Sequence, residues 1–305
     1  HVWHPYTQMF TAPTPIPIKS AKGVYFHTVD GRKILDGISS WWVNIHGHSH
    51  PRLNQALRIQ ADKLSQIIFA GFTHEPAARL ATQLVERTPK NLTKVFFSDD
   101  GSTAVEVALK MTCQYWHNRG QSQRNLFVSL KRAYHGDTFG AMSVGNVSEF
   151  HSRFSNLLFE VQRVSQSLSS IEKLLEREGE RVAALIIEPV VQAAGGMIIW
   201  PIEFLLHLRK ITNQHNIPLI ADEVFTGFGR TGKMFACSHG PIEPDVMCLS
   251  KGLTAGYLPL AVTLASEEIF EGFLSKDRSE TFFHGQATNQ PVHKICFPSC
   301  LTIFY

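Results

Sequence analysis

This chain of 305 residues lacks long hydrophobic runs, clusters of basic residues, internal repeats and low-complexity linkers. No segment is long and apolar enough to cross a bilayer, and the opening HVWHPYTQMF lacks the charged-then-apolar order of a signal peptide. The formal net charge is only +3 with the histidines neutral, and the lysines and arginines are scattered. We therefore expect neither a membrane nor a nucleic acid as a partner.

Cysteine is scarce, with five residues at irregular positions. An odd number without regular spacing does not suggest a disulfide framework. Cys113, Cys237 and Cys248 lie in apolar or mixed stretches, where they are most simply reduced thiols of the core. This usage predicts a cytoplasmic protein.

What the chain does contain is a series of apolar runs separated by helical stretches. Residues 21–37 predict a hairpin around the turn Asp30-Gly31, and residues 51–67 have leucines at helical spacing. Later runs are apolar on both faces, which is typical of an α/β fold with a mostly parallel sheet covered by helices on both sides. These runs are KVFF (94–97), LFVSL (126–130), VAALIIEPV (182–190), IPLIADEV (217–224), DVMCLS (245–250) and LAVTLAS (260–266).

Four residues suited to chemistry fall at or just beyond the ends of these runs: Gly101, Glu188, Asp222 and Lys251. Parallel strands end at the same edge of a sheet, and ligands of such folds bind there. The coincidence predicts a binding site at this edge.

Lys251 and Asp222 suggest a specific chemistry. Small and apolar neighbours around Lys251 would desolvate its amine, and a neutral lysine can form a Schiff base. Asp222 ends a run of buried type, so its carboxylate needs a partner. The partner is either structural, such as Arg230 or a backbone amide, or it is the cationic ring nitrogen of a cofactor such as pyridoxal phosphate.

A phosphate site is predicted by FFSDDGSTAVEVALK, where a strand ends at Gly101 and a helix starts at Ser102 or Thr103. The free amides and the dipole at a helix start favour an anion. Ser102 is alternatively a plain N-cap without a ligand. A sugar- or nucleotide-phosphate binder using Gly101 is a competing function, and it would leave Lys251 unmodified by borohydride.

Aromatic and acidic residues near these ends allow two readings each. Tyr134 suits stacking on a pyridine ring, although Tyr134 or His135 can equally be a packing residue. Glu188, just before Pro189, is either an orienting acid or a local cap.

The stretch SSWWVNIHGHSHP holds two tryptophans and three closely spaced histidines. Trp41 and Trp42 either belong to the core or form a pocket wall. The spacing of His46, His48 and His50 invites a metal site, but no cysteine or carboxylate cluster stands beside them, so we expect no metal.

Three signatures together resemble the class III aminotransferases of fold type I: IIEPVVQAAGGM, LIADEVFTGFGRTGK and CLSKGLT. The resemblance runs from about residue 4 to about residue 285. It implies a pyridoxal 5'-phosphate enzyme that works as a homodimer with sites at the interface.

Four further stretches, HPYTQM, DGISSWWVNIHGHSHP, FTHEPA and YHGDTFGAMSV, resemble one branch of that family. Members of this branch transfer an amino group from S-adenosylmethionine to 8-amino-7-oxononanoate and make 7,8-diaminononanoate for biotin biosynthesis. Lysine as the amino donor is the alternative.

The resemblance also implies roles for matching residues. Lys251 would hold the cofactor covalently and move the proton, Asp222 would bind the ring nitrogen, and Tyr134 would stack on the ring. Gly101 and Ser102 would bind the phosphate. The substrate would contact Tyr6, Trp41, Trp42, Tyr134, Asp137, Arg230 and Lys251, with Asp137 and Arg230 forming a polar pair.

Two departures from the family pattern shape the remaining expectations. The stretch HGQATNQP only partly matches a segment that reaches the neighbouring subunit's phosphate, which makes Thr288 a candidate substitute there. We expect residues 1–45 to form the N-terminal part of a small domain, 46–285 a large cofactor-binding domain and 286–305 an atypical tail, with the C-terminal small domain absent. A truncated product that binds the cofactor but is catalytically impaired is the alternative function.

Overall fold

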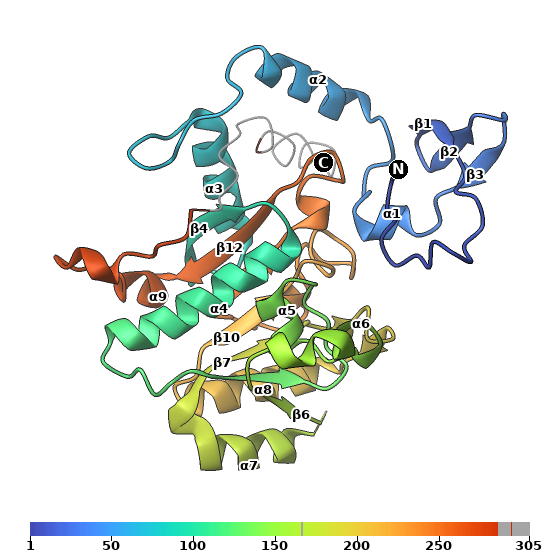
Figure 1. The fold of residues 1–305 in the computed structure, drawn as a ribbon. Coiled ribbons are helices and arrows are strands. Elements are labelled where there is room, and N and C mark those ends of the chain that lie inside the picture. The colour runs from blue at the N-terminus through green and yellow to red at the C-terminus, as the bar shows by residue number, and fades with distance from the viewer. Residues whose placement is uncertain (166, 286–293, 295–305) are drawn as a thin grey trace.

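A seven-stranded sheet forms the centre of the computed structural model, which describes residues 1–165, 167–285 and 294 (Figure 1). The strand order is β4-β12-β11-β10-β7-β5-β6. Only β12 runs antiparallel to its neighbours, so the mostly parallel sheet expected from the sequence is confirmed. The strands are β4 (Leu92–Ser98), β5 (Leu126–Leu130), β6 (Val161–Val164), β7 (Val182–Ile187), β10 (Leu219–Asp222), β11 (Val246–Leu249) and β12 (Ala261–Ser266).

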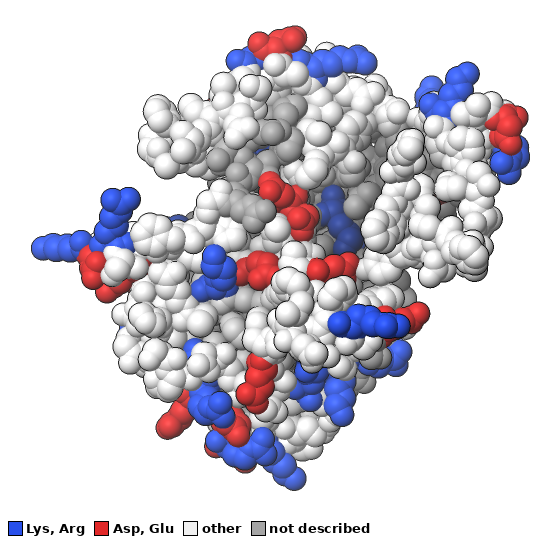
Figure 2. All heavy atoms as spheres, in the orientation of Figure 1, with Lys and Arg blue, Asp and Glu red and all other residues white. Residues whose placement is uncertain are grey.

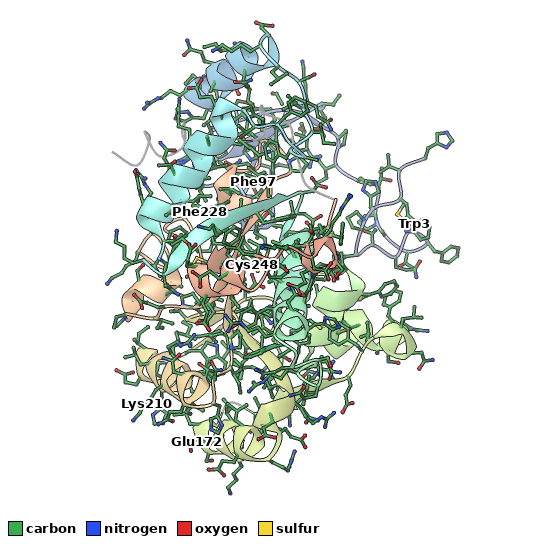
Figure 3. The ribbon with its side chains drawn as sticks, turned by 90° about the vertical axis from the view of Figure 1, so that its left-hand side faces the viewer. Trp3, Phe97, Glu172, Lys210, Phe228 and Cys248 are labelled. Carbon is green, nitrogen blue, oxygen red and sulfur yellow. The ribbon has the colours of Figure 1, made fainter. Side chains whose placement is uncertain are left out.

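Helices cover both faces of this sheet because its strands are apolar on both sides. Successive residues of β7 alternate between two buried clusters, Ile186 facing one and Leu185 and Ile187 the other. The first cluster includes α4 (Gly101–Asn118) and α5 (Phe139–Val144), and the second includes α3 (Glu75–Arg87), α7 (Leu168–Glu178) and α8 (Ile202–Gln214). Figure 3 shows Cys248 inside the sheet, and Lys210 and Glu172 on the outer helices α8 and α7.

The N-terminal segment forms a separate three-stranded antiparallel sheet beside the central one (Figure 1). Its strands are β1 (Ile18–Lys22), β2 (Tyr25–Thr28) and β3 (Lys33–Leu35), and the predicted hairpin corresponds to β2 and β3. After the short turn α1 (Ser39–Trp42) comes α2 (Pro51–Ala61). This helix is shorter than the expected 51–67, because the amides of Lys63 and Leu64 both turn back to the carbonyl of Gln60.

Short elements complete the described chain. Among the residues that the structure describes, no helix combines the length and the apolar character that a membrane span requires. The edge strand β6 escaped prediction because its sequence, VQRV, contains no continuous apolar run. The remaining elements are α6 (Ser148–His151), β8 (Val191–Gln192), β9 (Ile198–Ile199), α9 (Glu267–Glu271) and 3-10 turns at Ser152–Leu157, Gly179–Arg181, Ala236–His239, Lys251–Leu253 and Arg278–Glu280.

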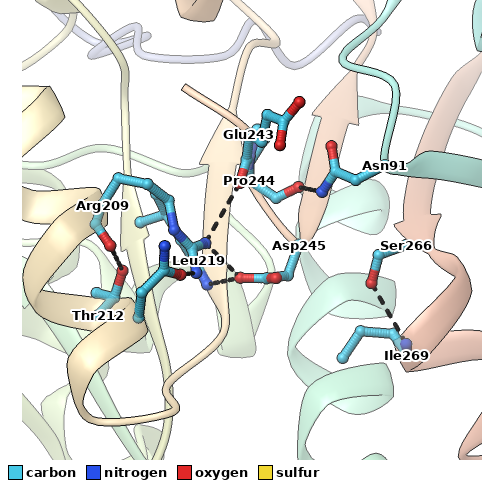
Figure 4. A network of polar contacts seen from close by, with 10 residues as sticks. Asn91, Arg209, Thr212, Leu219, Glu243, Pro244, Asp245, Ser266 and Ile269 are labelled. Carbon is cyan, nitrogen blue, oxygen red and sulfur yellow. Dashed lines mark hydrogen bonds and ion pairs between the residues drawn. The ribbon is translucent and has the colours of Figure 1, made fainter. Parts of the chain in front are cut away.

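An ion pair ties α8 to the amino ends of β10 and β11 (Figure 4). Oδ2 of Asp245 accepts from Nη1 of Arg209 at 2.5 Å and from the amide of Leu219 at 2.7 Å. The backbone of Asp245 also pairs with Leu219 and Ser266. Asp245 therefore connects α8, β10 and β12 through its side chain and backbone, at the edge of the sheet away from the strand ends that carry the predicted site.

We expect Asp245→Asn to lower the free energy of unfolding by about 1–3 kcal/mol, because an amide group would face a cation and a backbone N–H. Urea unfolding measures this change as a lower midpoint at an unchanged slope. Glu75→Gln is the control, since Glu75 lies 3.9 Å from Arg79 in an exposed pair whose loss costs below about 0.5 kcal/mol. Equal losses of stability in the two variants would contradict a stabilising role of the Asp245 contacts with Arg209 and Leu219.

Candidate active site

The carboxyl ends of the parallel strands surround a cavity of about 460 Å³. Figure 2 shows a hollow near the centre of this face, with acidic and basic side chains on either side of it. The predicted residues Gly101, Ser102, Tyr134, Asp222 and Lys251 all line the cavity. Glu188 lines it as well, so the expectation that the strand ends bring Gly101, Glu188, Asp222 and Lys251 together is confirmed.

Lys251 lies directly after β11 and Ser250, with its amine in the cavity. Its Nζ is 5.8 Å from the ring centre of Trp42, and the amine has no hydrogen-bond partner among the residues that the structure describes. Burial lowers the pKa of this amine, and the carboxylates of Asp222 and Glu188 only partly oppose that effect. A partly desolvated amine of this kind is a potential nucleophile and base.

Asp222 is buried at the end of β10 and has two polar partners. Nδ1 of His135 donates to its Oδ2 at 2.7 Å, and the amide of Val224 donates to its Oδ1 at 3.1 Å. Arg230 is not its partner, because that guanidinium donates to the carbonyl of Trp42 at 2.8 Å. The structural reading of Asp222 was therefore right about a backbone amide and wrong about Arg230.

Glu188 lines the cavity and also orients the backbone around it. Its carboxylate accepts from the amides of Tyr134 and Ala193, both at 3.0 Å. Burial raises its pKa to about 7. The contacts place Tyr134 at the cavity wall, so Glu188 acts as an orienting acid for this loop.

The start of α4 presents two free amides to the cavity. Asp100 is the N-cap and forms a reciprocal capping box with Thr103, so the reading of Ser102 as the N-cap is wrong. The amides of Gly101 and Ser102 have no acceptor among the described residues. A Cβ on Gly101 would lie 2.6 Å from Cγ1 of Val224, so only glycine permits this close approach.

Asp137 gathers two phenols at the edge of the cavity. Its Oδ2 accepts from the hydroxyls of Tyr6 at 2.6 Å and Tyr134 at 2.9 Å. Burial, the Tyr6 hydroxyl and the charge of Asp137 raise the pKa of Tyr134, which keeps its phenol a proton donor. The predicted pair of Asp137 with Arg230 is not formed in the described structure, because each residue has other partners.

The two tryptophans differ in their surroundings. Trp42 lines the cavity, whereas Trp41 is half exposed and meets the Tyr6 ring edge-on at 5.4 Å. Both have positive φ, at 66° and 62°, within a left-handed turn. The pocket-wall reading is therefore right for Trp42.

The three closely spaced histidines His46, His48 and His50 do not line the cavity. His48 bonds to Asp36 at 2.9 Å and to Asn44 at 2.8 Å. No group of three or more His, Cys, Asp or Glu residues in the described ranges is placed to hold a metal. Thr288 lies outside the described residues.

Sequence reasoning missed that His135 is a hydrogen-bond partner of Asp222 and that Val224 lines the cavity. The sequence predicts only a packing role for His135. Its position after a buried strand, at the same edge of the sheet as Asp222, is the signal that points to a polar role. Nothing in a lone valine after Asp222 and Glu223 distinguishes it from a core residue.

The chain matches the family model described as Aminotransferase class-III over residues 6–290. Similar curated proteins are named adenosylmethionine-8-amino-7-oxononanoate aminotransferase. The one from Synechococcus elongatus is 49% identical over 303 residues, covering 94% of this chain and 71% of that protein. The one from Aquifex aeolicus is 41% identical over 307 residues, covering 93% and 68%.

Solved structures agree with these sequence matches. The crystal structure of the Methanocaldococcus jannaschii protein of the same name has a TM-score of 0.96 and 40% identity, covering 100% of this chain and 72% of that one. An amine transaminase from an uncultivated Pseudomonas species, solved in a PLP-bound form, has a TM-score of 0.92 and 34% identity, covering 99% and 74%. The chain belongs to the class III aminotransferase family.

Proposed function

We propose that this chain is a pyridoxal 5'-phosphate-dependent aminotransferase that moves an amino group from S-adenosylmethionine to 8-amino-7-oxononanoate. The product is 7,8-diaminononanoate, an intermediate of biotin biosynthesis. The single observation that carries the proposal is the meeting of the Lys251 amine, the Asp222 carboxylate and two free amides of α4 in one cavity. The relatives named for this reaction support the choice of substrates.

The residues present fit the cofactor. The free amides of Gly101 and Ser102 at the start of an 18-residue helix suit its phosphate. Asp222 suits a protonated ring nitrogen, and the amine of Lys251 suits the aldehyde. Tyr134 and Val224 line the cavity as walls for a flat ring.

When bound, pyridoxal phosphate supplies an electron sink that stabilises negative charge at the carbon next to the transferred amine. Lys251 would hold the group and then carry the proton on Nζ, a task that its lowered pKa favours. His135 would keep the Asp222 carboxylate oriented toward the ring nitrogen by occupying Oδ2.

The substrate would lie between the cavity and its aromatic edge. Tyr6, Trp41 and Trp42 would contact its apolar part, and the hydroxyl of Tyr134 and the carboxylate of Asp137 would meet its polar groups. Arg230 would act through Trp42, whose carbonyl it holds at 2.8 Å.

A homodimer in the cytoplasm completes the proposal. The N-terminal segment exposes large apolar side chains, with Trp3 87% and Phe10 95% accessible, as expected of a surface that another chain covers. In Figure 3, Trp3 projects away from the body of the molecule. Thr288 of a second copy would approach the phosphate.

The proposed compartment is the cytoplasm. The free thiols of Cys113, Cys237 and Cys248 suit such a reducing environment. Domain limits of 1–45, 46–285 and 286–305 remain part of this proposal.

We expect Lys251→Ala to abolish covalent cofactor attachment and to reduce turnover by at least about 10²–10⁴-fold. Intact mass before and after borohydride treatment measures the attachment. Lys276→Ala replaces an exposed lysine and is the control, which should keep the mass increase and the activity. A cofactor adduct that borohydride still traps in Lys251→Ala would contradict the proposal.

The reactivity of Lys251 should depend on pH with a midpoint below the ordinary lysine value of about 10.4. Asp222→Asn should lower the midpoint further, because the charge of Asp222 raises the pKa of Lys251. Arg230→Gln should raise it, because the positive charge of Arg230 has the opposite effect. The measurement is the rate of Lys251 acylation in cofactor-free protein, followed by mass spectrometry across pH. Identical midpoints in all three proteins would disprove this electrostatic account.

We expect S-adenosylmethionine, and not lysine, to discharge its amine to the bound cofactor in a single half-reaction. The loss of the cofactor's visible absorbance band on mixing with each donor measures this step. Bleaching by lysine alone would reassign the donor. Bleaching by neither donor, with the covalent attachment intact, would favour the catalytically impaired alternative.

A further inference from the structure

His151, at the end of α6, is almost completely buried beside the aromatic edge of the cavity and has no role in the reaction described above. It is 5% exposed. Its Nε2 lies 3.5 Å from Oδ1 of Asp137. Apart from this contact, neither ring nitrogen has a polar partner within the described part of the chain. The carboxylate of Asp137 is thus the group that this imidazole can serve.

Packing holds the His151 ring in place. The ring lies nearly parallel to that of Tyr134, with 6.0 Å between centres and 19° between planes. Phe150 meets it edge-on at 6.3 Å. Gly145 provides the space, since a Cβ there would lie 2.9 Å from Cε1 of His151. The position of Nε2 is therefore set by the surrounding side chains.

The two oxygens of Asp137 have different neighbours. Oδ2 accepts from both Tyr6 and Tyr134, whereas Oδ1 faces His151. A partial rotation of the carboxylate about its Cβ–Cγ bond would move Oδ2 out of line with the two phenols. The contact with His151 is the largest influence that lowers the pKa of Asp137. The dipole of an N–H on Nε2, directed at Oδ1 from 3.5 Å, opposes this rotation.

We propose that His151 is a positioning residue that holds the Asp137 carboxylate in the plane that aligns the phenols of Tyr6 and Tyr134 at the mouth of the cavity. The inference rests on the proposed function only in assigning Tyr134 to the cofactor and Tyr6 to the substrate. The alignment itself is a property of the protein without its cofactor.

The test compares His151→Phe, which keeps a stacked ring but removes both nitrogens, with His151→Gln, which keeps an N–H donor. We expect kcat/KM for S-adenosylmethionine to fall about ten- to hundredfold in His151→Phe and to be largely restored in His151→Gln. His207→Phe is the matched control, since Nε2 of His207 lies 3.5 Å from Oε1 of Glu172 on the outer helices. It should change kcat/KM by less than about twofold.

A double-mutant cycle separates positioning from general damage. In an Asp137→Asn background, His151→Phe should add less than about a twofold loss, because the partner it acts through is already altered. The same loss in both backgrounds would overturn the proposal. His151→Leu replaces His151→Phe if the latter does not fold.

Crystal structures of the cofactor-free variants give a readout that does not depend on activity. In His151→Phe we expect the Asp137 carboxylate to have rotated, with at least one phenol beyond about 3.5 Å. Retention of both phenol contacts would refute the positioning role. If the unmodified chain and the His207 control trap no cofactor with borohydride, the proposed function fails, and these structures still decide the role of His151.

Discussion

The pairing of Asp222 with His135 is the interaction around which the candidate site is arranged. A carboxylate that is 5% exposed needs polar partners, since one buried without them costs several kcal/mol. Nδ1 of His135 and the amide of Val224 meet that need at 2.7 and 3.1 Å. Because His135 follows β5 and Asp222 ends β10, their contact joins the loop after β5 to the end of β10, with β7 between them in the sheet. Tyr134, the neighbour of His135 in the chain, lines the cavity together with Lys251.

Several features of the site are unfavourable by themselves and depend on the core around them. Lys251, Phe228 and Ala255 have φ values of 42°, 60° and 53°, in the left-handed region that costs a side-chain-bearing residue about 1–2 kcal/mol. Burial also disfavours the charged form of the Lys251 amine. Two apolar clusters, one on each face of the sheet, hold the strand ends that impose these conformations. Stability from the core thus maintains a reactive amine and strained loops.

Local patterns predicted much of this arrangement and failed where two local choices compete. Continuous apolar runs located every strand of the central sheet except β6, whose polar residues interrupt the pattern. At the start of α4 the sequence pattern pointed to Ser102 as a possible cap, whereas Asp100 is the N-cap through its reciprocal bonds with Thr103. The leucine spacing after residue 51 continued past the true end of α2, because the turn at Gln60 carries no distinctive residue. Which residue caps or ends a helix depends on differences in free energy of about 1 kcal/mol, and the spacing of apolar residues in the sequence does not reveal them.

The sequence by itself determined the order of strands and helices, and with it the placement of Gly101, Asp222 and Lys251 at one edge of a parallel sheet. This follows because side-chain periodicity and apolar content are properties of neighbouring residues. Only the tertiary structure decided the polar partners: His135 for Asp222, Trp42 for Arg230, and Tyr6 for Asp137. These pairs are 87 to 188 residues apart in the chain. Their contacts arise from the packing of whole layers, which the local pattern does not contain.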